Sequence, residues 1–155
     1  MKPEETIDFN VKGLWHAIAR MYNEEASKYG STLATAHILL NIDQENGTPS
    51  TSLGPKMGME TTSLSRTLKS MEERGLIYRE RNPEDGRGVL IKLTPEGVKM
   101  RNVSRSAVIS FNEQVASHFT PAKLHAFFEV ARTINHLIQN KSIQINTTNQ
   151  TEKLK

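Results

Sequence analysis

The sequence predicts a mainly α fold with one small β-hairpin. Apolar residues recur at helical spacing along most of the chain, and this period changes between residues 77 and 93. There, two short stretches of strand-forming residues flank a loop rich in turn formers. The length of 155 residues suits one compact unit, although a hydrophobic content of 36% is thin for a solitary globule. Some apolar surface is therefore expected to be buried against a partner chain.

The first two helices follow from an apolar stripe and from their end signals. The first carries Ile7, Val11, Leu14, Ile18 and Met21 on one face and is expected to end at Gly30. The second begins after Thr32, a residue that favours the N-cap position, and is expected to stop at Asn46-Gly47.

The next two helices lie close together in the chain. A third helix follows Ser50, but Gly54-Pro55 interrupts it, so we expect it to be short or irregular and to end at Gly58. The fourth runs from about Thr61 to Arg74, stops at Gly75 and buries Leu64, Leu68 and Met71.

The hairpin comes next and is followed by two long helices. Residues 77–81 and 89–93 are the predicted strands. Thr94-Pro95-Glu96 and Thr120-Pro121 are both helix-start signals, because threonine caps a helix and proline fits its first turn. The fifth helix is expected to reach Phe119 and the sixth to carry the stripe of Leu124, Phe128, Ala131, Ile134 and Ile138. From Lys141 the chain is polar without a period, and a floppy tail is expected.

The charge distribution points to a polyanion. The formal net charge is only +3, but ten of the 20 Lys and Arg residues lie between residues 50 and 101, interleaved with Ser and Thr. Clustered cations can neutralise phosphates and release counterions, although a solvated charged face is an equally simple interpretation of the charge alone.

Several classes of protein are disfavoured. The chain has no cysteine, which excludes disulfides, thiol redox sensing and thiolate metal sites. We find no apolar run of membrane length and no leader, so a cytoplasmic protein without membrane contact is expected. No catalytic motif is present, so an enzyme is not predicted and no catalytic residue or cofactor is assigned. His125 and Glu129 are spaced as two metal ligands, but two ligands do not make a site, so no metal is predicted.

The fourth helix has the composition of a DNA-reading helix. Opposite its buried stripe it offers short hydroxyls and two cations, which can contact base edges and phosphates. These candidate DNA-binding residues are Thr62, Ser63, Ser65, Arg66 and Lys69. The alternative is an ordinary amphipathic surface helix, which more often carries Glu/Lys pairs than a group of Ser and Thr residues.

The hairpin loop adds a second candidate contact. Asp85 and Arg87 flank Gly86, so the carboxylate can hold the guanidinium or cap the turn while Arg87 enters a minor groove. An Asp-Gly turn with incidental charges is the competing interpretation. Helix, helix, strand, loop and strand together form the order of a winged helix-turn-helix, in which the hairpin is the wing.

The residues from 59 to 97 resemble the MarR (multiple antibiotic resistance regulator) family. The likeness rests on Leu64-Ser65-Arg66-Thr67-Leu68, Glu73-Arg74-Gly75-Leu76-Ile77, Arg79, Asn82-Pro83-Glu84-Asp85-Gly86-Arg87 and Val89-Leu90-Ile91-Lys92-Leu93-Thr94-Pro95-Glu96-Gly97. The helix pattern extends it over about residues 5–138. Gly54-Pro55 in the third helix departs from the family pattern.

The resemblance implies a homodimer with long N- and C-terminal dimerisation helices. It divides the chain into a dimerisation helix (1–31), a winged helix-turn-helix domain (32–94), two dimerisation helices (95–140) and a polar tail (141–155). It also implies a ligand-responsive repressor that binds a pseudo-palindromic operator in double-stranded DNA, with a small aromatic or anionic effector. Trp15, His16 and Arg20 on the first helix are the candidate ligand residues, although a core or interface position is the simpler interpretation of Trp15.

Two other functions remain open at this point. One is a winged-helix module that binds protein and not DNA, which would not need small hydroxyls and Arg66 on an exposed helix face. The other is a constitutive DNA-binding protein without an effector, because a ligand pocket leaves no sequence motif.

Overall fold

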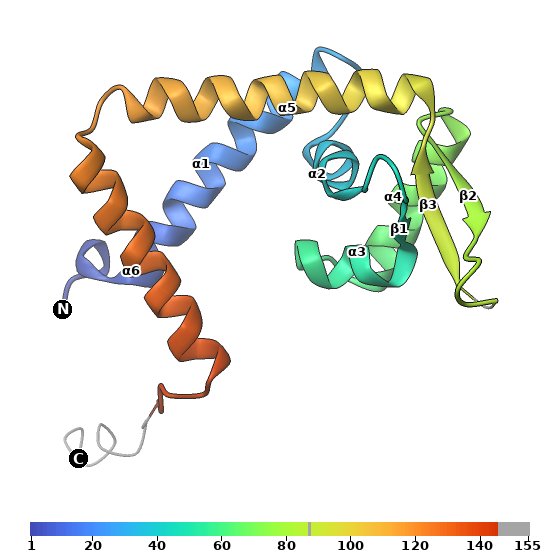
Figure 1. Cartoon of the computed structure of the whole chain (residues 1–155). Helices are drawn as coiled ribbons and strands as arrows, with labels where there is room; N and C mark the ends of the chain where they lie inside the picture. The colour runs from blue at the N-terminus through green and yellow to red at the C-terminus, as the bar shows by residue number, and fades with distance from the viewer. Residues whose placement is uncertain (87, 146–155) are drawn as a thin grey trace, which may run out of the picture. The chain divides into compact units, whose positions relative to one another are not determined.

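The fold is mainly helical, with a small antiparallel sheet, as the sequence predicts. The computed structural model describes residues 1–86 and 88–145. A short 3-10 helix (η1, Pro3–Glu5) precedes the other elements (Figure 1). The helices are α1 (Ile7–Ser27), α2 (Leu33–Asn41), α3 (Ser50–Met57), α4 (Thr61–Glu73), α5 (Pro95–Ala116) and α6 (Pro121–Gln139), and the strands are β1 (Thr48–Pro49), β2 (Ile77–Arg81) and β3 (Val89–Leu93).

The chain forms two compact units, Met1–Ser110 and Phe111–Lys155. The first unit holds α1 to α4, the sheet and most of α5. The second contains the last turns of α5 and the helix α6, which has no buried residue of its own.

Threonine caps begin three of the helices at the predicted places. The Thr32 hydroxyl accepts a hydrogen bond from the Thr35 amide at 3.2 Å, and Thr94 accepts one from Gly97 at 3.0 Å. Thr120 likewise accepts from Lys123 at 3.4 Å. Each cap satisfies an amide that has no partner within its helix, which is why these short signals locate helix ends well.

Helix α2 ends earlier than the sequence suggested. The expected stop was Asn46-Gly47, but the helix ends at Asn41 and Ile42 is already extended. The Asp43 carboxylate accepts hydrogen bonds from the amides of Glu45, at 3.0 Å, and Asn46, at 2.7 Å. These bonds lower the pKa of Asp43 and close a turn that competes with the helix.

Helix α3 is short and ends where the sequence predicted. Gly58 adopts a left-handed conformation with φ of 61° and its amide bonds the Gly54 carbonyl. Pro55 lies within the helix, which nevertheless continues to Met57. The Gly54-Pro55 departure therefore lies within a helix that Gly58 ends.

The sheet contains a strand that the sequence analysis missed. The order is β1-β3-β2, with both pairs antiparallel, and Thr48 faces Ile91 across the first pair. The predicted hairpin strands have the predicted bounds, and Ile77 pairs with Leu93 at their base. Pro49 in β1 is tolerated because it lies on an edge strand.

The core lies among α2, α3, α4 and the sheet, which Figure 1 shows gathered together. Its buried residues are Ile38, Leu39, Ile42, Leu53, Leu64, Leu68, Met71, Leu76, Ile77 and Ile91. These include the three residues predicted as the buried stripe of α4. The core thus fixes α4 and the hairpin with respect to each other.

Candidate nucleic-acid interface

Helix α4 buries one side and exposes the other. Leu64, Leu68 and Met71 lie in the core, whereas Thr62, Ser63, Ser65, Arg66 and Lys69 are all exposed. A spacing of three or four residues places Thr62, Arg66 and Lys69 along one face. All five predicted contact residues therefore lie together on the solvent side of one helix.

The two cations on this face differ in their surroundings. Lys69 lies 4.0 Å from Glu73, one turn further along, in an exposed pair that contributes little to stability. Within residues 1–86 and 88–145, no hydrogen bond or ion pair holds the Arg66 guanidinium. Its fork of donors is available for a base edge or a phosphate.

Charged contacts connect the hairpin to α4 and strengthen the sheet. Arg79 of β2 donates to the Glu72 carboxylate of α4 at 3.0 Å. Across the sheet, Lys92 lies 2.6 Å from Glu80, and this bond raises the pKa of the Lys92 ammonium. The Arg79–Glu72 pair therefore links the hairpin to the reading helix, in addition to the shared core, whereas the Lys92–Glu80 pair links the two hairpin strands.

The wing loop is a closed turn at its base. The Asn82 amide donates to the Gly88 carbonyl at 2.9 Å, and Gly88 donates back to the carbonyl of Asp85 at 2.8 Å. Arg81 donates through Nε to the Gly86 carbonyl at 3.1 Å. The Asp85 side chain is exposed, whereas Arg87, the other predicted wing residue, lies outside the described residues. The sequence analysis missed Arg81 because its contact is with a backbone oxygen five residues away.

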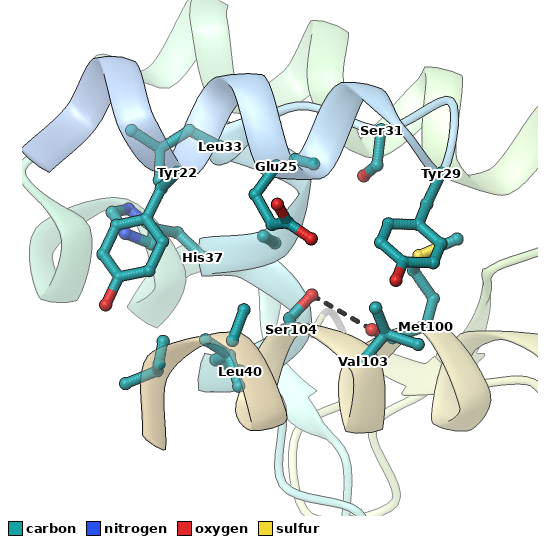
Figure 2. Close-up of a pocket in the computed structure, with 14 residues that line it drawn as sticks. Tyr22, Glu25, Tyr29, Ser31, Leu33, His37, Leu40, Met100, Val103 and Ser104 are labelled. Carbon is teal, nitrogen blue, oxygen red and sulfur yellow. Dashed lines mark hydrogen bonds between the residues drawn. The ribbon is translucent and has the colours of Figure 1, made fainter. Parts of the chain in front are cut away.

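A pocket opens in the first unit, between α1, α2 and α5 (Figure 2). Its cavity volume is about 40 Å³, and the hollow around it is open to solvent. Tyr22, Glu25, Tyr29, Ser31 and His37 supply its polar groups, and aliphatic side chains of α5 form the opposite wall.

None of the predicted ligand residues lines this pocket. His16 and Arg20 are exposed, and Trp15 is 50% exposed. The Trp15 ring stacks on His37, with ring centroids 6.1 Å apart, and His37 does line the pocket. Sequence reasoning missed the pocket because its walls come from segments about 80 residues apart in the chain, residues 22–40 and 100–108.

Metal binding and membrane insertion are two properties that the sequence did not predict. Across the described part of the chain, no three His, Cys, Asp or Glu side chains are grouped to hold a metal ion. No described helix combines the length and apolar character needed to cross a membrane.

A braced reading helix beside a β-wing defines the class of this protein as a winged helix-turn-helix protein. Comparison with known proteins makes the class specific. Residues 32–89 match the model of the MarR family, and this part of the chain has the winged-helix fold of a MarR family transcription regulator. It is accordingly a regulator that binds DNA, in a family of regulators and not of enzymes.

The relatives agree with this assignment. The chain is 29% identical over 101 residues to the organic hydroperoxide resistance transcriptional regulator of Bacillus subtilis. The aligned residues make up 65% of this chain and 69% of that protein. A crystal structure of the Staphylococcus aureus MepR–DNA complex superposes with a TM-score of 0.77 and 17% identity, covering 84% of this chain and 97% of that one. The structure of the PcaV regulator of Streptomyces coelicolor, solved with its natural ligand, superposes with a TM-score of 0.74 and 20% identity. The superposition covers 88% of this chain and 96% of that one. These two structures establish the likeness of fold.

Proposed function

We propose that this protein is a ligand-responsive repressor that binds a pseudo-palindromic operator as a homodimer. The observation that carries the proposal is the exposed face of α4, where three hydroxyls, Arg66 and Lys69 lie opposite the buried stripe. Hydroxyls and a free guanidinium suit base edges in the major groove, whereas a lysine suits a phosphate. Asp85 and Arg87 of the wing would contact the adjacent backbone or minor groove.

Dimerisation is supported by apolar side chains that lie on the surface of α1 and α6. These side chains are each between 36% and 61% exposed. Soluble monomers rarely expose so many large apolar side chains together on two helices. We propose that a second copy of the chain covers them, with residues 1–31 and 95–140 forming the dimerisation region around the DNA-binding domain of residues 32–94. The residues concerned are Ile7, Phe9, Val11, Leu14, Trp15, Phe127, Phe128, Val130, Leu137 and Ile138.

Sedimentation velocity at micromolar concentration should give about twice the chain mass of 17.4 kDa. Replacing Val130 and Ile138 together with aspartate should produce monomers, because two charges would then lie in the apolar contact. Monomers should lose operator affinity while the winged lobe remains folded. A wild-type monomer that still binds its operator tightly would refute the dimer.

A mobility-shift experiment tests DNA binding itself. The probes are an inverted repeat taken from the DNA that flanks the coding region and a random duplex of equal length. We expect salt-sensitive binding to both, with tighter binding to the repeat. Absence of any shift at low salt would favour the protein-binding module, and equal affinity for both duplexes would argue against an operator.

Peroxide should leave operator binding unchanged. The chain contains no cysteine, so low doses that oxidise cysteine sensors have no thiol to attack, although a relative bears the name of a hydroperoxide resistance regulator. The measurement is operator affinity before and after treatment, with mass spectrometry to exclude methionine oxidation. Loss of binding that a thiol reductant restores would contradict the expectation.

A further inference from the structure

The pocket between α1, α2 and α5 is acidic. Among its described lining residues, Glu25 is the single side chain that carries a formal charge at neutral pH, and none is Lys or Arg. Burial lowers the pKa of His37, which favours its neutral form. An anionic ligand in this pocket would meet a carboxylate and would find no cation among these lining residues.

The Glu25 carboxylate pairs with a cation that does not line the pocket. Lys28, one turn along α1, lies 2.5 Å from Glu25 Oε2. Its side chain is 66% exposed and does not line the pocket. An exposed pair of this kind is worth little, so a bound cation can share or displace Lys28.

Ser31 supplies a second, independent sign of a polar ligand. Its hydroxyl oxygen is buried and has no hydrogen-bond partner, and the residue is only 8% exposed. Figure 2 shows Ser31 and Glu25 reaching from the same side of the pocket toward α5. A buried hydroxyl without a partner destabilises the protein. A ligand that donates a hydrogen bond to this oxygen would offset that penalty, which would favour binding.

The remaining walls suit an apolar body near a positive charge. The rings of Tyr22 and Tyr29 stand on either side of Glu25 in Figure 2, and the negative faces of aromatic rings attract cations. The α5 wall is aliphatic, and its Ser104 hydroxyl is already engaged with the Met100 carbonyl at 3.0 Å.

We propose that the pocket binds a protonated amine with an aromatic or aliphatic body, its ammonium group directed at Glu25 and Ser31. The ammonium would donate to the carboxylate and to the unpartnered hydroxyl while its body packs on α5. This inference rests on the ligand response proposed above. The proposed ligand differs in charge from the anionic effector that the family resemblance implies, for which Trp15, His16 and Arg20 are the candidate residues.

The test compares two ligands of similar shape and opposite charge. Phenethylamine is the cation and 3-phenylpropionate the anion, and each is titrated to millimolar concentration with the full-length protein. The readout is the fluorescence of Trp15, the one tryptophan of the chain, which stacks on His37 at the pocket wall. We expect phenethylamine to bind more tightly by on the order of tenfold.

Glu25→Gln should weaken phenethylamine by roughly twofold to fivefold, as expected for a partly exposed ion pair, and should not weaken 3-phenylpropionate. Glu24→Gln is the matched control, because it removes the same charge one residue away at an exposed position that does not line the pocket. It should change neither affinity, and circular dichroism should confirm that both variants fold.

Three results would overturn the inference. These are no saturable change with phenethylamine, tighter binding of 3-phenylpropionate, and equal effects of Glu25→Gln and Glu24→Gln. A mobility shift without ligand, run on the same preparations, separates this failure from that of the proposed function. If the operator shifts normally while phenethylamine does not bind, only the assignment of the ligand is wrong.

Discussion

Replacing Gly97 with alanine is expected to destabilise the protein at or above the upper end of the roughly 1–3 kcal/mol that overpacking costs. A Cβ added at Gly97 would lie 1.9 Å from the Leu76 carbonyl oxygen and 3.0 Å from its carbon. Both atoms belong to the backbone, so no flexible side chain can move aside. Either the first turn of α5 or the segment between α4 and β2 must shift.

The contact matters because it joins three elements at one point. The Thr94 amide donates to the Leu76 carbonyl at 3.1 Å, and the Thr94 hydroxyl donates to the Gly75 carbonyl at 2.6 Å. The same hydroxyl caps α5 by accepting from Gly97. The start of α5 is therefore bonded directly to the end of the reading helix, and a displaced α5 would break several of these bonds together.

The measurement is thermal unfolding at a fixed protein concentration, where about 3 kcal/mol corresponds to a fall of roughly 6–12 °C for a chain of this size. Gly13→Ala is the matched control, since Gly13 is a helical glycine with no atom within 4 Å of its added Cβ. That change should stabilise the protein slightly, by about 0.5–1 kcal/mol. If the two variants melted at the same temperature, the close contact at Leu76 would not exist in the native protein.

Arg66→Ala is expected to weaken operator binding more than random DNA binding. A lost bidentate base contact costs about 1–3 kcal/mol, and a dimer loses two, so operator affinity should fall by about thirtyfold or more. Arg87→Ala should instead weaken both DNAs alike, because a wing arginine acts mainly through charge. Loss of two cation contacts should change the slope of log affinity against log salt by roughly two.

Affinities for both duplexes across a salt series provide the test, with Arg105→Ala as a control that removes an exposed cation from α5. An Arg66 variant that weakened both DNAs equally would make Arg66 a phosphate contact and leave base reading to Thr62, Ser63 and Ser65. An Arg87 variant with unchanged affinities and slopes would remove the wing from the interface.

The sequence by itself determined the features that depend on neighbours in the chain. Apolar stripes, threonine caps and glycine stops act within a few residues, so they located α4, the hairpin strands and the starts of α5 and α6. The exposed face of α4 was also predictable, because Leu64, Leu68 and Met71 define its buried side and helical geometry then fixes the opposite one.

Only the tertiary structure decided the features that depend on distant partners. Strand β1 has two residues and exists because Thr48 and Pro49 pair with Ile91 and Leu90, some 40 residues away. The end of α2 is an exception with a local cause, because the Asp43 carboxylate accepts from the amides of Glu45 and Asn46 before Gly47 is reached. The pocket and the Gly97 contact each bring together segments that are distant in the chain, and no local pattern encodes which residues will meet there. Packing of the whole fold places those segments side by side. The sequence alone therefore could not show that Glu25 is the charged residue among the lining residues of the pocket.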